Sequence, residues 1–377
     1  MKQKITLPDG LAVYGGLGLL LLLGIAAFLF PMDFSVWERR VLAEAPSNYS
    51  LTDWTLQTDL ENYLSDQVPL RRALVNIHAV LETATGRAVQ LDAWPQMDGE
   101  GSLRFIEKPV SATHEAVQKH IDALNSLAGD IPHWFLTPPT AGSLLRGQMT
   151  GVRRAVYDED AALYKTVFQQ ENAVQILADF AVVPSARLYY RTDHHWNLSG
   201  AWQAYLNYCE ALGLTPAEKN QFSWVTGDDA PRFLGTTYSR SGLPFAAADA
   251  LEYAEPLFSV TLRILDDGTE YDHLIFPEQA DTYDGYAIFL KGNHGLIEIE
   301  NHSAPERTLF VCKDSFANCE LPFLAANYSR IVAADARYLS GTLNEALESV
   351  GHVDDVLFLY SLDSLATDTS ILRKIKR

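Results

Sequence analysis

Short apolar runs alternate with helical patterns through the C-terminal third of the chain, and this alternation constrains the fold more than any other feature. Strands are expected at 309–312, 330–334 and 356–360, with a helix after each of the first two. Thr342 and Glu345 have the spacing of a capping box where the second helix begins. Strand–helix–strand units with short connections form right-handed crossovers and a parallel sheet. The sequence therefore predicts an α/β fold with a mostly parallel sheet flanked by helices.

The middle of the chain continues the alternation less regularly. The expected elements are a helix at 113–127, a buried strand at 133–136, a helix at 158–180, a strand at 186–190 and a helix at 199–212. Many short strand-like runs and turn signals fill 220–295, which indicates an irregular insertion with β character. These elements place an α/β domain at 96–377.

An uncharged apolar run occupies residues 11–30. At about 1.5 Å per residue it is roughly 30 Å long, which matches the hydrocarbon core of a membrane. Lys2 and Lys4 precede it, so the positive-inside rule leaves the leader, 1–10, in the cytoplasm. We expect a transmembrane helix at 11–30 and a body outside the cytoplasm. A cleaved signal peptide has the same consequence for the body, whereas a buried soluble helix does not.

Residues 31–95 are expected to form a stalk and an N-terminal helical segment. Apolar residues recur at helical spacing from Asp59 to Leu81, and Pro69 divides this pattern into two short helices.

Composition excludes several classes of function. The chain has 48 acidic and 29 basic residues and a net charge of −19, which argues against nucleic acid as a partner. The three cysteines, Cys209, Cys312 and Cys319, form no CxxC pair, so neither a disulfide framework nor a structural zinc site is expected. Buried free thiols are the expected state.

Two polar loops contain the reactive residue types. The first, 191–197, follows the strand expected to end at Tyr190, and the second, 313–318, follows the strand ending at Cys312. In such sheets, chemistry collects at the carboxyl ends of the strands. We therefore expect both loops at one edge of the sheet.

Spacing within the loops predicts a catalytic triad. Asp193 and His195 are two residues apart, so they share a face of extended backbone, and the carboxylate can hold the imidazole with Nε2 free as a base. Ser315 is at a strand-to-helix turn, where its N–H and the helix N-terminus can stabilise an oxyanion. A serine hydroxyl is a weak nucleophile unless a base lies beside it, so the two loops need each other.

Neighbouring residues allow several interpretations. His194 could bind a metal with Asp193 and His195, but no further aspartate cluster accompanies them, so no metal or cofactor is expected. Trp196 either packs over the Asp–His pair or forms a platform for a sugar. Arg191 either pairs with a carboxylate or binds substrate.

Three motifs together resemble the DHHW protein family. They are Thr-Asp-His-His-Trp at 192–196, Gly-Asn-His at 292–294 and Lys-Asp-Ser-Phe-Ala-Asn at 313–318. That family is similar to the alginate O-acetyltransferases of the SGNH-hydrolase-like superfamily. The segments 38–42 and 66–71 also look like pieces of this group, so the resemblance extends from about residue 35 to the end.

The resemblance implies an SGNH-hydrolase-like fold with a serine acyl-transfer site. Ser315 matches the nucleophile, His195 the base and Asp193 the orienting acid, while Asn293 matches the oxyanion-hole asparagine beside the N–H of Ser315. The order of the motifs, Asp–His before Ser, is that of the alginate enzymes.

Two positions depart from the alginate enzymes. His194 replaces a threonine and Lys313 replaces a glycine of their motifs. A different choice of donor or substrate is expected to follow. The residues expected to contact substrate are Arg191, Trp196, His194 and Lys313.

The leading hypothesis is a membrane-anchored, extracytoplasmic serine O-acyltransferase or acylesterase. Its substrate is expected to be the acetyl groups of a cell-envelope or exported polysaccharide, with a multi-span membrane O-acyltransferase as acetyl donor. Transfer and hydrolysis are not distinguished by the residues, because they differ only in whether a sugar or water takes the acetyl group. The alternatives are a non-catalytic protein for glycan binding or export-complex assembly and, third, a metal-dependent hydrolase.

Overall fold

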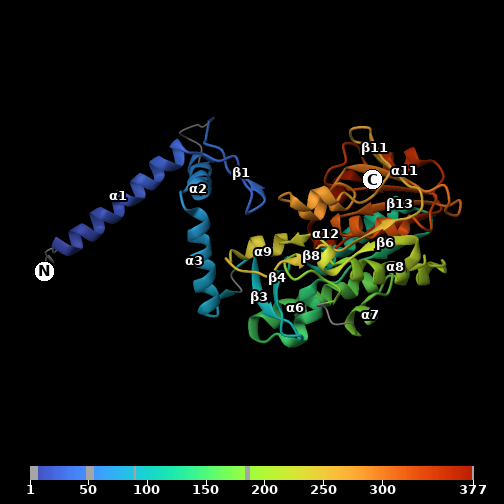
Figure 1. The fold of residues 1–377 in the computed structure, drawn as a ribbon, viewed down its shortest axis with the longest axis horizontal. Coiled ribbons are helices and arrows are strands. Elements are labelled where there is room, and N and C mark those ends of the chain that lie inside the picture. Colours follow the sequence, from blue (N-terminus) through green and yellow to red (C-terminus); the bar gives the residue numbers. More distant parts are fainter. Residues whose placement is uncertain (1–6, 48–54, 89–90, 183–186, 376–377) are drawn as a thin grey trace. The chain divides into compact units, whose positions relative to one another are not determined.

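The computed structural model describes residues 7–47, 55–88, 91–182 and 187–375. The chain divides into two compact units (Figure 1). The N-terminal unit comprises residues 1–85 together with 242–244, and the C-terminal unit comprises 86–241 and 245–377. All of the reactive residues identified above belong to the C-terminal unit.

The N-terminal unit is helical. Its elements are α1 (Leu7–Leu29), the small hairpin β1 (Phe34–Ser35) and β2 (Arg40–Val41), α2 (Thr55–Gln67) and α3 (Arg71–Ala84). The predicted break at Pro69 is confirmed, because α2 ends before it and α3 begins after it. Asp66 accepts two hydrogen bonds from the Arg40 guanidinium, at 2.8 and 2.5 Å, and thereby joins α2 to the hairpin.

The transmembrane helix expected at 11–30 is not supported. Among the described residues, none of the helices combines the length and the apolar character that crossing a membrane requires.

A seven-stranded mixed sheet forms the centre of the C-terminal unit, with the strand order β11-β10-β12-β14-β13-β15-β5. The parallel half contains β5 (His133–Leu136), β13 (Thr308–Lys313), β14 (Arg330–Ala334) and β15 (Asp355–Leu359). The strands β10 (Thr261–Ile264), β11 (Thr269–Tyr271) and β12 (Leu296–Glu300) extend it in antiparallel fashion. The predicted α/β class and the parallel arrangement of the C-terminal strands are confirmed, and the insertion supplies β10 and β11.

Helices and short hairpins surround this sheet (Figure 1). The helices are α4 (His114–Ala128), α5 (Ala141–Leu145), α6 (Gly151–Phe168), α7 (Leu177–Val182), α8 (Leu198–Leu212), α9 (Thr236–Ser241), α10 (Leu321–Leu324), α11 (Leu343–Val350), α12 (Leu362–Thr367) and α13 (Thr369–Lys374). β3 (Ala93–Met97) and β4 (Leu103–Glu107) form a hairpin. Two further two-stranded antiparallel sheets pair β6 (Phe222–Val225) with β9 (Tyr253–Pro256) and β7 (Arg232–Phe233) with β8 (Asp249–Ala250).

Local signals fix several helix ends as the sequence predicts. The Thr113 side chain caps α4, which stops before Gly129. Thr342 and Glu345 form the expected capping box on α11. Gly213 adopts the left-handed conformation with φ 64° after α8.

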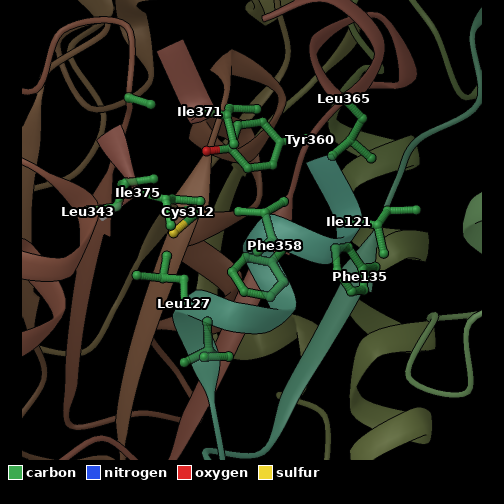
Figure 2. Close-up of a cluster of buried hydrophobic side chains, with 14 of the residues drawn as sticks. Ile121, Leu127, Phe135, Cys312, Leu343, Phe358, Tyr360, Leu365, Ile371 and Ile375 are labelled. Carbon is green, nitrogen blue, oxygen red and sulfur yellow. The ribbon is translucent and has the colours of Figure 1, made fainter. Parts of the chain in front are cut away.

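The main hydrophobic core lies between the parallel strands and the helices that cover one face of the sheet. Figure 2 shows Phe358 and Cys312 on adjacent strands, packed with side chains from α4, α11 and α13. Phe358 and Phe135 are fully buried with ring centroids 4.9 Å apart. All three cysteines are free, buried thiols. This core fixes the positions of β13 and β15, whose carboxyl ends carry part of the site.

The helix expected at 158–180 is wrong in its extent. It divides into α6 and α7, because the segment between them runs along the edge strand β5. There the N–H of Phe135 donates to the Asn172 carbonyl at 3.0 Å, and the N–H of Val174 donates to the Phe135 carbonyl at 2.8 Å. Backbone pairing with the sheet edge outweighs the helical spacing of the apolar residues.

The strand expected at 186–190 does not form within the described residues, of which 186 is not one. Tyr189 makes only an isolated bridge, to Trp196. The local backbone instead closes on its own loop, since the N–H of Asn197 donates to the Leu188 carbonyl at 2.9 Å and that of Tyr190 to the His195 carbonyl at 3.3 Å. The first polar loop therefore does not follow a strand of the central sheet.

Replacement of Phe358 by alanine should lower the free energy of unfolding by about 3–5 kcal/mol, because it leaves a cavity in the core of the sheet. Phe245→Ala is the matched control, since that ring is 52% exposed, and it should change stability by less than about 0.5 kcal/mol. Denaturant unfolding of both variants measures the difference, and equal losses would contradict this description of the core.

Candidate active site

The first polar loop is anchored by a buried carboxylate from the insertion. Asp249, in β8, accepts hydrogen bonds from the backbone N–H groups of Arg191 and Thr192, at 3.0 and 2.8 Å, and from the Thr192 hydroxyl at 2.6 Å. It also pairs with the Arg191 guanidinium at 3.0 Å. The loop thus has a fixed backbone where Asp193 begins.

Asp193 holds His195 through two contacts to the same oxygen. Its Oδ1 accepts from the His195 N–H at 3.0 Å and lies 2.6 Å from His195 Nδ1. Its Oδ2 accepts from the N–H of Thr236 at 2.7 Å. A carboxylate only accepts, so Nδ1 carries the proton and Nε2 is left as an acceptor.

The second polar loop is fixed by Asp314. Its Oδ1 accepts from the N–H of Phe316 at 3.0 Å, and its Oδ2 accepts from the Ser361 N–H and the Ser364 hydroxyl, both at 2.8 Å. Ser315 therefore begins a short 3₁₀ helix, η8 (Ser315–Cys319), directly after β13. The first N–H groups of such a helix have no partner within it, which leaves the Ser315 N–H available.

The structure brings the two loops together. Ser315 Oγ lies 2.7 Å from His195 Nε2, so the hydroxyl donates to the imidazole. The indole N–H of Trp196 donates to the Phe316 carbonyl at 3.0 Å and joins the same two loops a second time. Asp193, His195 and Ser315 thus form one continuous hydrogen-bonded chain.

Aromatic rings enclose the imidazole. Tyr286, in the 3₁₀ helix η7 (Gly285–Ile288), stacks on His195 with centroids 3.8 Å apart and planes inclined by 6°. Phe316 lies 4.8 Å away on a tilted plane. Sequence reasoning missed Tyr286 because it lies in the irregular insertion, outside any motif.

Burial controls the charge states of the pair. Burial and, to a smaller extent, the neighbouring His194 lower the pKa of His195 to about 4, although Asp193 opposes the shift. Burial tends to raise the pKa of Asp193, but electrostatic attraction to His194 and His195 and the two hydrogen bonds from His195 hold it well below its usual range. His195 is therefore a neutral base at neutral pH, beside an ionised carboxylate.

An open cavity leads to Ser315. It encloses about 820 Å³, its mouth included, and both Ser315 and His194 line it. Arg240 and Arg337 also line it, each paired with a carboxylate, Glu107 and Asp335 respectively. The sequence carried no motif that pointed to these two arginines.

Of the four residues expected to contact substrate, only His194 lines this cavity. Trp196 is 0% and Lys313 1% exposed, so both lie beneath the site, and substrate contact is not supported for them. Arg191 is engaged with Asp249, which agrees with its alternative interpretation as the partner of a carboxylate.

Asn293, the expected oxyanion ligand, lies in the turn before β12. Its Oδ1 accepts from the side-chain amide of Asn318 at 3.0 Å. Asn318 belongs to η8, the same short helix that begins with Ser315. The structure thus connects Asn293 to the short helix that begins with Ser315.

A metal could in principle be held by Asp193, His194 and His195, whose donor atoms lie within 4.8 Å of one another. Both ring nitrogens of His195 are already engaged, one with Asp193 and the other with Ser315. A metal at this position would have to displace one of these bonds. The donor set therefore fits proton transfer between a serine and a histidine better than metal binding.

Comparison with known proteins confirms the resemblance inferred from the motifs. The model of the DHHW protein family matches residues 164–334, which include all three members of the hydrogen-bonded chain. No curated protein matches the sequence.

Among solved structures, a DHHW family protein from Eubacterium siraeum superimposes with a TM-score of 0.60 and 21% identity, covering 74% of this chain and 95% of that one. The structure of Bacillus cereus PatB1 with a sulfonyl adduct superimposes with a TM-score of 0.59 and 21% identity, and the match covers 75% of this chain and 99% of that one. The O-acetyltransferase domain of Pseudomonas putida AlgJ has a lower TM-score of 0.38 and 13% identity, and the match covers 72% of this chain and 92% of that one. The first two share the fold of this chain.

The imidazole of His195 should remain neutral far below the usual histidine range. In an NMR titration, its midpoint is expected near pH 4 rather than near the ordinary value of about 6.5. His195→Gln identifies the resonance. His194→Gln should move the midpoint upward, because a neighbour that lowers the pKa has been removed. A midpoint near 6.5 in the unmodified protein would refute the buried, neutral state.

Proposed function

We propose that this protein is a serine O-acyltransferase or acylesterase that acts on acetyl groups of a polysaccharide. The observation that carries the proposal is the chain from Asp193 through His195 to Ser315, with contacts of 2.6 and 2.7 Å, at the end of an open cavity. The motifs shared with the DHHW family support it, and the resemblance to the alginate enzymes is the basis for an acetylated polysaccharide as substrate.

The first half of the reaction forms an acetyl-serine. His195 Nε2 takes the proton of Ser315 as Oγ bonds to the acetyl carbonyl carbon, and the carbonyl oxygen becomes an oxyanion. Asp193 stabilises the resulting imidazolium. The intermediate then collapses, the bond to the leaving oxygen breaks, and that oxygen takes the proton from His195.

The oxyanion needs donors that are already in place. The N–H of Ser315 is one, because it begins η8 with no partner inside that helix. The side-chain amide of Asn293 is the second that we propose.

The second half returns the serine. A sugar hydroxyl or a water gives its proton to His195 and attacks the acetyl-serine, and Ser315 recovers its proton when the ester bond breaks. Transfer differs from hydrolysis only in which nucleophile occupies the cavity. The resemblance to the alginate enzymes favours transfer.

We further propose that the catalytic domain works outside the cytoplasm. The apolar run at 11–30 and the lysines before it have the pattern of an export signal. Acetyl groups would then have to cross the membrane, so the proposed donor is a multi-span membrane O-acyltransferase. Alkaline phosphatase fused to the C-terminus should be active, because its disulfides form only outside the cytoplasm. An inactive but intact fusion would contradict export.

A serine-directed sulfonyl fluoride or fluorophosphonate should label the protein at Ser315 and spare Ser315→Ala. Asp193→Asn should reduce turnover of a soluble acetyl ester on the order of 10³–10⁴-fold, because the imidazole loses its orientation and tautomer. After a brief pulse of acetyl donor, mass spectrometry should find one acetyl group on Ser315. Equal labelling of wild type and Ser315→Ala would end the proposal.

The acceptor decides between the two reactions. Acetylation of an added glycan would establish a transferase, whereas release of acetate without transfer would establish an esterase. If Ser315→Ala and His195→Ala left polymer acetylation intact while deletion of the chain abolished it, the protein would instead be a non-catalytic assembly or glycan-binding component.

A further inference from the structure

Lys313 is a buried cation that the hydrogen-bonded triad does not use. It is the last residue of β13, two positions before Ser315, and is 1% exposed. Burial lowers the pKa of this side chain, and Asp335 and Asp314 oppose that shift. Asp335 binds Arg337 through both oxygens, and Asp314 fixes the turn at Ser315. Burying an ammonium group is costly unless it is paired. Because burying Lys313 is costly and the residue lies two positions before Ser315, we expect its side chain to have a function at the site.

The Lys313 ammonium fixes the orientation of the Asn318 amide, which in turn fixes that of the Asn293 amide. Lys313 Nζ donates to Asn318 Oδ1 at 2.7 Å, and Asn318 Nδ2 donates to Asn293 Oδ1 at 3.0 Å. An ammonium group can only donate, so Asn318 must turn its oxygen towards Lys313 and its nitrogen towards Asn293. Asn293 must then present its oxygen to Asn318. Its own Nδ2 is left to face elsewhere as a donor.

The backbone that carries Asn293 is strained. Leu290, Lys291 and Gly292 have φ of 57°, 62° and 103°, a run of positive values in which two residues are not glycine. Such conformations persist where the surroundings hold them, and they concentrate at functional sites. Asn318 supplies part of this hold, since its Nδ2 also approaches the Gly292 carbonyl at 3.3 Å.

We infer that Lys313 is a positioning residue that acts through Asn318 to hold the Asn293 amide with its N–H₂ towards the oxyanion of the acetyl-transfer intermediate. The inference rests on the proposed function. Asn318 is three residues after Ser315 in η8, so the middle member of this chain belongs to the same short helix as the nucleophile. A donor oriented in advance needs no reorganisation when charge develops on the substrate oxygen.

The Asn318→Asp variant tests whether hydrogen-bond donation from Asn318 to Asn293 orients the Asn293 amide. An aspartate of the same size still accepts from Lys313, and it pairs with the charge, so folding should be retained. It cannot donate to Asn293 Oδ1, so the Asn293 amide should turn over and present its oxygen to the oxyanion. We expect kcat for a soluble acetyl ester to fall about 10²–10³-fold, with KM nearly unchanged.

Lys313→Met is the second variant, since it keeps the length of the side chain and removes the donor. It should also lower kcat rather than raise KM. Combining either change with Asn293→Ala should cost no more than Asn293→Ala alone, because all act through one amide. This comparison remains decisive if Asn318→Asp fails to fold. The His195 titration of folded variants should match wild type, because the contacts among Asp193, His195 and Ser315 are unchanged, whereas a general disturbance of the site would move it.

Two results would overturn the inference. One is wild-type kcat in Asn318→Asp. The other is a double variant whose loss is the product of the two single losses. Labelling of Ser315 in the wild type separates the two hypotheses: without it the proposed function fails, whereas labelling with unaffected Asn318→Asp turnover removes only the role of Lys313.

Discussion

The hydrogen bond between Ser315 and His195 is the contact on which the rest of the site depends. Two loops 120 positions apart in sequence meet there at 2.7 Å. Buried carboxylates fix each side, Asp193 and Asp249 for the histidine and Asp314 for the serine. Side chains held by several bonds stay within the narrow range of positions that proton transfer requires.

The site is also kept dry where the base lies. Tyr286 stacks on His195, and the imidazole is only 5% exposed, so water does not compete for Nε2. The same burial disfavours the charged imidazole and keeps it a base under acidic conditions. One arrangement therefore gives both geometry and protonation state, while the serine still faces an open cavity.

The irregular insertion contributes as much to the site as the regular sheet. Asp249, Thr236 and Tyr286 all belong to it and all contact the Asp–His loop or its imidazole. Gly235 permits this packing, because a Cβ there would lie 2.2 Å from the Cβ of Asp193. The insertion thus replaces the strand that was expected to hold the first loop, and variation in it offers a way to alter the cavity without changing the triad.

The sequence by itself determined the α/β class and the parallel arrangement of the C-terminal strands, because period, caps and short connections are local signals. The spacing within two loops also predicted the contact among Asp193, His195 and Ser315 that the structure contains. It misplaced the strand before Asp193, since that backbone finds its partners within its own loop. Only the tertiary structure decided that Trp196 and Lys313 lie beneath the site and that Tyr286 covers the base. Burial and partners depend on segments far apart in the chain, and no local pattern encodes where such segments meet.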